Sequence, residues 1–417
     1  MENGERAILV GLGPKQQEWE LRSTLDELAN LAETAQAIPV AKVLQFRDRK
    51  DPAWLIGRGK VEEIAKMAEE KQVDLVIFDQ ELSPAQLRNL ETLLPCKVID
   101  RTQLILDIFA GRARTKEGKI QVELAQLEYL LPRLSGKGKE MSRLGGGIGT
   151  RGPGEKKLET DRRHIRRQIR LLTGQLEEIK KHRRLHQQRR KKNRIPQVAL
   201  VGYTNAGKST LLNQLTGAEV QAENRLFATL DPTSRLLLLP SGKEIILTDT
   251  VGFIRRLPHH LVAAFRSTLE YVREADLLLH VIDASHPEAE EQIEVVEEVL
   301  ASLGASDIPV LKVWNKADLF SGDFPEQWGE NNLLVSAFSH ADLERLKEKI
   351  GQMLQEDIIT GQVSIPVTRG DWISLLHDRA EVIESETDEM VMNFRFRLSH
   401  TDYQQLPSEL KKRIQVQ

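Results

Sequence analysis

The sequence predicts an α/β protein with several domains. A central domain with a parallel sheet is preceded by a small α/β domain and a long helical hairpin, and is followed by a small α+β domain. Three observations lead to this prediction. Short apolar runs alternate with helical patterns in two separate regions, and a strongly basic helical segment lies between them. The chain of 417 residues is too long for one compact core and fits about two to four domains.

Changes in this pattern divide the chain into four parts. We expect an N-terminal α/β domain over residues 1–110 and a hairpin arm over 111–194. The central parallel-sheet domain should cover 195–358, and the small C-terminal α+β domain 362–417. In the last part, strands are expected over 364–367 and 390–398 with a helix over 372–380, and no group of residues there indicates a particular chemistry.

The first part alternates strands and helices. Helical patterns cover 18–35 and 60–71, and Ser83 followed by Pro84 predicts the N-cap and first residue of another helix. Apolar runs predict four strands, at 7–12, 40–46, 75–78 and 97–100. Because helices separate these strands, their sheet should be parallel.

The second part is helical with one interruption. The pattern over 101–134 predicts one helix, and eight glycines between Gly136 and Gly154 exclude a continuous helix beyond it. A second long helix is expected over 155–194. The apolar stripe of the first helix consists of Leu124, Leu127, Leu130 and Leu131. We predict that the two helices fold back on each other, with the glycine-rich loop near the tip.

Charge is concentrated in the second helix of this arm. Residues 156–194 carry 16 Lys or Arg against 4 Asp or Glu, a net charge of +12, whereas the whole chain carries −3. A basic arm on an otherwise acidic protein indicates a local contact with nucleic acid. Residues 156–194 contain no aromatic residue, so phosphate and groove-shape contacts are expected rather than base stacking. The alternative is a solvated charged face.

A strand, a glycine loop and a helix then follow in the order that a phosphate site requires. The residues Gly202, Gly207, Lys208 and Ser209 match the motif G-x-x-x-x-G-K-[ST]. Backbone N–H groups of such a loop surround phosphate oxygens, while Lys208 should reach the β- and γ-phosphates and Ser209 should bind Mg²⁺. The alternative is an ordinary glycine turn before a helix. The expected nucleotide contacts are Gly202, Tyr203, Thr204, Asn205, Ala206, Gly207, Lys208, Ser209 and Thr210.

Two later segments complete the expected phosphate and metal site. Asp249 follows the apolar run 245–247 and would bind Mg²⁺ through water, and the N–H of Gly252 would reach the γ-phosphate. In the segment FATLDPTSR we expect Thr229 to close on Mg²⁺, with Thr233 as the alternative. Further contacts are expected at Phe227, Ala228, Leu230, Asp231, Thr250 and Val251. The expected catalytic residues are Lys208, Thr229 and Gly252. The expected metal ligands are Ser209 and Thr229.

Two more motifs indicate that the base is guanine. The apolar run 310–314 leads into N-K-A-D, whose reading residues are Asn315, Lys316 and Asp318. The carboxylate of Asp318 can accept the two N–H groups on one edge of guanine, which adenine lacks. A final run, 333–335, leads to Ser336 and Ala337, where a backbone N–H can reach the guanine carbonyl oxygen. These motifs, each after a strand, predict a P-loop GTPase domain.

One group found in Ras-like GTPases is missing. Those proteins place a Gln directly after the glycine of D-x-x-G to orient the attacking water. Here Phe253 follows Gly252, and Ile254 comes next. Neither side chain can form a hydrogen bond with water, so we expect the isolated protein to hydrolyse GTP slowly.

These motifs resemble the HflX family of the TRAFAC class of GTPases. The stretch GGGIGTRGPGEKKLETDRR over 145–163 looks like the family signature, and FATLDPTSR and DTVGFIRRLP are similar to its switch regions. The resemblance covers nearly the whole chain and is less specific over the last 55 residues or so. It implies a cytoplasmic GTPase that binds the large ribosomal subunit and its RNA. It also implies that ribosomes stimulate hydrolysis and that stalled or hibernating ribosomes are split or rescued under stress.

Two other functions remain open. One is a GTPase checkpoint in large-subunit assembly, and the other is an RNA remodeller that also uses ATP through its N-terminal domain. We expect a monomer that does not bind DNA and does not insert stably into a membrane. The sequence has no run of 18 apolar residues, and its start, MENGERAILV, does not match a signal peptide. Its single cysteine, Cys96, excludes an intrachain disulfide.

Overall fold

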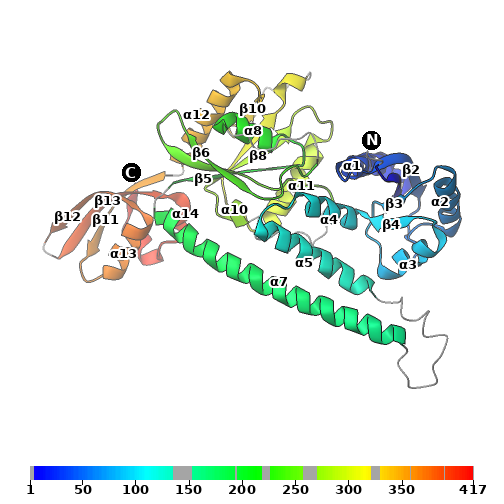
Figure 1. Ribbon diagram of the computed structural model, residues 1–417. Helices are drawn as coiled ribbons and strands as arrows, with labels where there is room; N and C mark the ends of the chain where they lie inside the picture. The colour runs from blue at the N-terminus through cyan, green and yellow to red at the C-terminus, as the bar shows by residue number, and fades with distance from the viewer. Residues whose placement is uncertain are drawn as a thin grey trace.

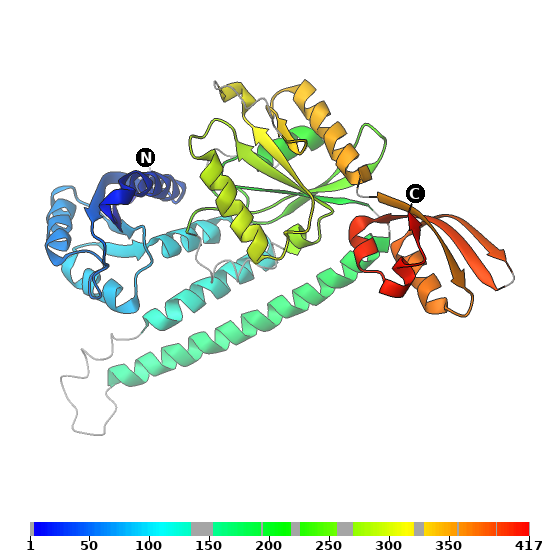
Figure 2. The same ribbon diagram turned by 180° about the vertical axis from the view of Figure 1, so that it is seen from behind.

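The computed structural model describes residues 4–134, 153–192, 195–217, 226–256, 270–320, 329–356, 358–388 and 390–416. The central domain lies between the N-terminal and C-terminal domains, and one long helix, α7 (Pro153–Lys192), runs along one side of the molecule (Figures 1 and 2). Most of the expected glycine-rich loop lies outside the described residues. Within them, no helix is both long enough and apolar enough to span a membrane.

The N-terminal domain contains a four-stranded parallel sheet in the order β2-β1-β3-β4. Its strands are β1 (Arg6–Gly13), β2 (Ile38–Phe46), β3 (Leu75–Phe78) and β4 (Lys97–Asp100). Its helices are α1 (Glu18–Thr34), α2 (Arg58–Glu70) and α3 (Pro84–Leu93). Ser83 caps α3 reciprocally with Gln86. The elements predicted up to residue 100 are therefore confirmed.

The single helix expected over 101–134 is wrong, because the segment forms α4 (Arg101–Arg112) and α5 (Lys116–Arg133). Thr115 starts α5 as its N-cap, and its hydroxyl accepts a hydrogen bond from Gly118 N. The backbone N–H of Thr115 in turn donates to Asp231 of the central domain, 116 residues further along the chain. The helical pattern could not indicate a break that depends on such a distant partner.

Helices α5 and α7 lie side by side and form the hairpin that was predicted (Figures 1 and 2). The residues buried between them are Ile120, Leu124, Leu172 and Leu176. The expected stripe is only partly right, since Leu130 is 43% exposed. Instead Val122, Ala125 and Tyr129 are buried on another side of α5, in a core shared with the N-terminal and central domains.

The central domain has a six-stranded sheet in the order β10-β9-β8-β5-β7-β6. The strands are β5 (Gln197–Gly202), β6 (Thr233–Leu238), β7 (Glu244–Asp249), β8 (Leu277–Asp283), β9 (Val310–Asn315) and β10 (Asn332–Leu334). The helices are α8 (Lys208–Thr216), α10 (Glu270–Arg273), α11 (Ala289–Ser302) and α12 (His340–Glu356). The predicted parallel sheet is confirmed, with β6 added antiparallel to β7. One sheet face packs against α8 and α12, while the other joins the core shared with the N-terminal domain.

The C-terminal domain has an antiparallel sheet in the order β12-β13-β11-β14. Its strands are β11 (Ile358–Pro366), β12 (Glu381–Asp388), β13 (Val391–Ser399) and β14 (Gln415–Val416). Its helices are α13 (Gly370–Arg379), α14 (His400–Gln404) and α15 (Ser408–Lys411). The expected helix and second strand are confirmed, whereas the first strand begins earlier, at Ile358. Strand β12 was not predicted, because its sequence, EVIESETD, is polar and its side chains are largely exposed.

Candidate nucleotide-binding site

The loop between β5 and α8 has the backbone conformations that a phosphate-binding loop needs. Asn205 and Gly207 have φ angles of 64° and 94°, in the left-handed region. A Cβ atom on Gly202 would lie 2.2 Å from Val281 O, and one on Gly207 would lie 2.3 Å from Asn315 Nδ2. Both glycines are therefore required by close packing as well as by backbone conformation.

Lys208 begins α8 and extends back over this loop. Its Nζ donates to the carbonyl oxygens of Gly202 at 3.1 Å and Tyr203 at 2.7 Å. Burial lowers the pKa of Lys208 to about 8, while the nearby carboxylate of Asp249 opposes the shift. A Cβ on Gly252 would lie 3.0 Å from Lys208 Nζ, so the backbone at Gly252 lies close to the ammonium group. A phosphate bound here would meet a cation and a closely approaching backbone.

Three oxygen-bearing side chains meet beside Lys208. Ser209 Oγ donates to Asp249 Oδ2 at 2.6 Å and lies 2.7 Å from Thr229 Oγ1. Asp249 Oδ1 is buried and has no hydrogen-bond partner among the described residues. Burial raises the pKa of Asp249, against the attraction of Lys208.

This oxygen cluster has the chemistry of a Mg²⁺ site, since Mg²⁺ prefers carboxylate and hydroxyl oxygens and water. The buried, unpartnered Asp249 Oδ1 is a polar atom that a hydrated cation would satisfy. The structure places Thr229 in the cluster, while Thr233 begins β6 and pairs with Asp249 in the β6–β7 ladder.

A pocket opens between the phosphate-binding loop and the segment that carries Thr229. Its walls are Thr204, Asn205, Gly207, Lys208, Ser209, Thr210, Phe227, Ala228, Thr229, Thr250 and Gly252. Three of the motifs found in the sequence are thus brought together around one space.

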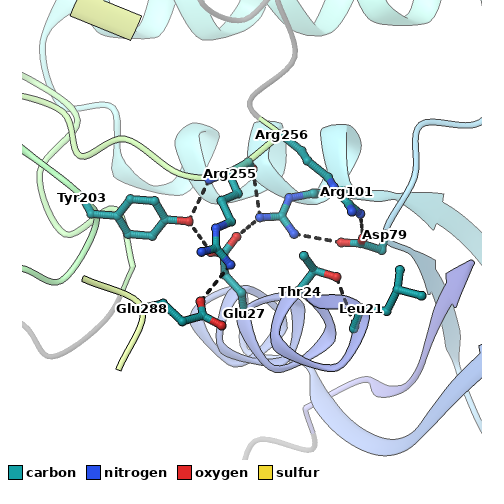
Figure 3. A network of polar contacts seen from close by, with 9 residues as sticks. All are labelled: Leu21, Thr24, Glu27, Asp79, Arg101, Tyr203, Arg255, Arg256 and Glu288. Carbon is teal, nitrogen blue, oxygen red and sulfur yellow. Dashed lines mark hydrogen bonds and ion pairs between the residues drawn. The ribbon is translucent and has the colours of Figure 1, made fainter. Parts of the chain in front are cut away.

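Among the expected nucleotide contacts that do not line this pocket, four have side chains directed toward the N-terminal domain, the arm or the core that they share. Leu230 and Val251 are buried in the core shared with the N-terminal domain. Both carboxylate oxygens of Asp231 bind the segment before α5. The Tyr203 side chain extends toward the N-terminal domain (Figure 3). At these positions only backbone atoms remain available to a ligand, because the side chains serve the domain contact.

Asn315, at the end of β9, joins the phosphate-binding loop to the last motif. Its Nδ2 donates to Ala206 O at 3.0 Å, and its Oδ1 accepts from Ala337 N at 3.2 Å. Asn315 is 2% exposed. Its side chain therefore acts as a brace between two loops.

The remaining residues of the base-reading motifs lie next to one another. Asp318 is in a short 3-10 helix, η2 (Ala317–Leu319), and its Oδ1 accepts a hydrogen bond from Ser336 Oγ at 2.6 Å. Lys316 has a φ angle of 63° and its Nζ donates to Asp283 Oδ2 at 2.6 Å. Ser336 therefore fixes the orientation of the Asp318 carboxylate.

A polar network that sequence reasoning missed connects this site to the N-terminal domain (Figure 3). The hydroxyl of Tyr203 contacts Glu27 and accepts from Arg255 N at 2.8 Å. The guanidinium of Arg101 contacts Glu27 and donates to Asp79 Oδ1 at 2.8 Å. These side chains come from well-separated segments of the chain, so no local pattern in the sequence could identify them as partners.

The same network holds the segment after Gly252. Arg255 pairs with Glu288 at 2.7 Å, and Arg256 contacts Asp79, which lies at the end of β3. Burial raises the pKa of Asp79 to about 6, and the charge of Arg256 opposes this shift. Burial likewise lowers the pKa of Arg101 to about 10. Buried ion pairs thus hold the segment after Gly252 against the N-terminal domain.

Comparison with known proteins gives consistent results along the chain. The family model described as "GTP-binding GTPase N-terminal" matches residues 22–110, and "GTP-binding GTPase Middle Region" matches 112–190. The model "50S ribosome-binding GTPase" matches 197–316. A structure titled as a GTP-binding protein from Sulfolobus solfataricus in complex with GDP is 27% identical and covers 84% of this chain and 99% of its own. Its TM-score is 0.45.

Curated relatives match over most of their length. GTPase HflX of Caldanaerobacter subterraneus is 54% identical over 92% of this chain and 89% of its own. GTPase HflX of Alkalihalophilus pseudofirmus is 47% identical, covering 98% and 97%. The Escherichia coli protein of the same name is 44% identical, covering 92% and 90%. Together with the phosphate and base motifs gathered in the central domain, these identities establish that the chain is a GTPase of the HflX family.

Proposed function

We propose that this GTPase binds GTP with Mg²⁺, docks its arm on the large ribosomal subunit and splits or rescues stalled or hibernating ribosomes under stress. It acts in the cytoplasm as a monomer. The family model that matches 197–316 is described as a 50S ribosome-binding GTPase, which supports the ribosomal partner. The observation that carries the proposal is a row of exposed arginines on α7.

This row consists of Arg163, Arg166, Arg167 and Arg170. With Leu131 and Ile169 these arginines line a groove on the hairpin. Their spacing of three and four residues brings them together on the helix surface. A dense positive surface without aromatic residues suits the phosphate backbone of folded RNA. Ribosomal RNA is the partner that best matches this chemistry.

In the nucleotide pocket, each residue has a proposed task. Lys208 and the N–H of Gly252 bind the phosphates, and Asp318 reads the guanine edge. Ser209 and Thr229 hold Mg²⁺ directly, and Asp249 holds it through water, which fits the three convergent side chains. Bound there, Mg²⁺ would neutralise charge on the phosphate oxygens during transfer.

The water-orienting group is proposed to come from the ribosome. The ring of Phe253 is 2% exposed and is buried in the core shared with the N-terminal domain. It does not line the nucleotide pocket and therefore cannot contact a γ-phosphate there. Basal hydrolysis should therefore be slow. We expect the large subunit to fix the segment from Phe253 onward and to position water or an RNA phosphate; its far end, Leu257, lies outside the described residues.

Cosedimentation with purified ribosomal subunits tests this proposal. With a non-hydrolysable GTP analogue, wild type should pellet with large subunits, and binding should fall steeply with salt. Converting Arg163, Arg166 and Arg167 to Glu should abolish pelleting and leave GTP affinity unchanged. Each lost phosphate contact should lower the salt slope by about one unit.

A matched control changes the same number of charges elsewhere. The control residues are Arg395, Arg397 and Lys412, all exposed on the C-terminal domain. Converting them to Glu should leave pelleting intact. Salt-insensitive binding, or equal loss in both variants, would contradict the proposed use of the arm. Sucrose gradients of depleted cells then separate the roles: unsplit ribosomes after heat support rescue, whereas precursor subunits would indicate an assembly checkpoint.

A further inference from the structure

We propose that Asp231 is a positioning residue that couples the Mg²⁺-binding Thr229 to the orientation of the arm. The two residues stand two positions apart in the segment before β6. Thr229 Oγ1 lies 2.7 Å from Ser209 Oγ in the oxygen cluster. Asp231 faces the other way and binds the start of α5, the first helix of the arm. The inference rests on the proposed role of Thr229.

The contact between Asp231 and the arm is specific. Asp231 Oδ2 accepts hydrogen bonds from the backbone N–H groups of Arg114 and Thr115, both at 2.8 Å. Asp231 Oδ1 accepts from Thr115 Oγ1 at 2.5 Å. The same Thr115 oxygen accepts from Gly118 N at 2.9 Å and so caps α5. Asp231 therefore fixes the orientation of the residue that caps the arm helix.

Gly118 shows how closely the two parts fit. A Cβ atom at this position would lie 2.3 Å from Asp231 Oδ1, well inside contact distance. Gly118 is in the first turn of α5 and has no positive φ angle, so backbone conformation does not call for glycine there. The absence of a side chain allows the carboxylate to reach the cap.

A second contact joins the segment that carries Thr229 to helix α4, which precedes α5 in the chain. The ring of Phe227 packs edge-on against Phe109 of α4, with ring centroids 4.7 Å apart. Phe227 has a φ angle of 54°, which is costly for an aromatic residue and needs support from its surroundings. Leu230 is buried in the same shared core. The segment is thus anchored to α4 and α5 on both sides of Thr229.

This arrangement makes the arm sensitive to the nucleotide. When Thr229 is held at the oxygen cluster, Asp231 is held at the cap of α5. When Thr229 is released, Asp231 loses its fixed position and the first turn of α5 loses its support. Because coupling free energy is reciprocal, RNA that fixes the arm must favour the engaged state of Thr229 by the same factor. Asp231 transmits both the effect of the nucleotide on the arm and the effect of RNA on Thr229.

Amide hydrogen exchange of the full chain measures this coupling at residues 116–120. In wild type, a GTP analogue with Mg²⁺ should slow exchange there relative to GDP, on the order of fivefold, the size expected for one helix-cap interaction. Asp231→Asn should reduce the difference, since the amide has one acceptor oxygen where the carboxylate has two, and its nitrogen cannot accept the hydrogen bonds made at the other position. Its GDP affinity should stay unchanged, and its kcat for GTP should fall while KM changes little.

Two further variants distinguish a loss of coupling from misfolding of the protein. Gly118→Ala favours helix α5 intrinsically yet displaces the Asp231 carboxylate, so it should remove the same difference. Asp51→Asn is the matched control, because Asp51 also accepts two backbone N–H groups, at 2.8 and 3.1 Å, but lies in the N-terminal domain away from the nucleotide. That control should keep the wild-type response.

The outcomes separate this inference from the function on which it rests. If Thr229→Ala abolishes the exchange difference but Asp231→Asn and Gly118→Ala retain it, the coupling through Asp231 is wrong and the role of Thr229 stands. If Thr229→Ala leaves both the exchange difference and the Mg²⁺ dependence of GTP binding intact, the proposed role of Thr229 fails first. Loss of the difference in the Asp51→Asn control would also overturn the inference.

Discussion

The guanidinium of Arg101 donates a hydrogen bond to the backbone carbonyl oxygen of Arg255, 3.1 Å away and across the domain boundary. Arg101 is 2% exposed and also contacts the carboxylates of Glu27 and Asp79 (Figure 3). A charge buried this deeply is tolerated only with such partners. The N-terminal domain is therefore joined to the segment after Gly252 by an interaction that is costly to break.

Arg101→Met should destabilise the protein strongly. The substitution removes the guanidinium that contacts both Glu27 and the buried Asp79, so that Asp79 keeps only its ion pair with Arg256 among the described residues, and breaking a buried pair costs roughly 3–5 kcal/mol. Guanidinium unfolding curves measure the change. Arg22→Met is the control, since Arg22 forms an exposed pair with Glu18 that should contribute less than about 1 kcal/mol. Equal effects of both substitutions would show that the Arg101 network does not stabilise the domain contact.

Acid should destabilise the central domain through His280. This residue lies in β8 and is 1% exposed, and burial together with the charge of Lys312 lowers its pKa to about 3. Between about pH 6.5 and pH 3, His280 is therefore protonated in the unfolded chain and neutral in the folded chain. The stabilising contribution of the neutral His280 is fully present above about pH 6.5. Below that pH, the free energy of unfolding should fall by up to about 1.4 kcal/mol per pH unit.

Unfolding curves between pH 7 and pH 5 test this contribution. His280→Gln removes the titrating group, so the difference in stability between wild type and the variant should shrink as the pH falls. A difference that is constant over this range would mean that His280 accepts a proton in the folded state.

Lys208→Ala should weaken nucleotide binding severely. The phosphates lose their main cationic partner, and charge-assisted hydrogen bonds are about twice as strong as neutral ones. Isothermal titration with GDP and a GTP analogue measures the loss. The overall fold should persist, because among the described residues the ammonium bonds only to backbone carbonyls of its own loop. Unchanged affinity would exclude this pocket as the nucleotide site.

Asp318→Asn should shift base preference from guanine toward xanthine. The carboxylate accepts two N–H groups from guanine, whereas an amide also donates and matches a carbonyl at that edge. Ser336 holds Asp318 Oδ1 at 2.6 Å and should orient the amide similarly. Competition binding with guanosine and xanthosine diphosphates gives the ratio. An unchanged ranking of the two nucleotides would remove Asp318 from the base-reading role.

Local patterns in the sequence predicted much of the fold. The strands at Leu75–Phe78 and Lys97–Asp100 have the predicted bounds, because short apolar runs between helices leave few alternatives. The motif around Lys208 was equally readable, since its glycines, cation and hydroxyl are adjacent in the chain. Such features depend on neighbours within a few residues.

Contacts between distant segments were not predictable in the same way. The break before α5 depends on Asp231, and the role of the Tyr203 side chain depends on Glu27, 176 residues earlier. In the sequence alone Tyr203 is simply one residue of the phosphate loop. Only the folded chain shows that its ring leaves the loop and joins the two domains.

The central claim is that docking of the basic arm on the large subunit switches on GTP hydrolysis. Steady-state hydrolysis with and without purified large subunits tests it most directly. Charge reversal at Arg163, Arg166 and Arg167 is preferable to deletion of the arm, because deletion would remove Leu172 and Leu176 from the hairpin core. We expect slow basal hydrolysis in both proteins and strong stimulation in wild type alone. Equal stimulation of both proteins, or fast hydrolysis without any subunit, would contradict it.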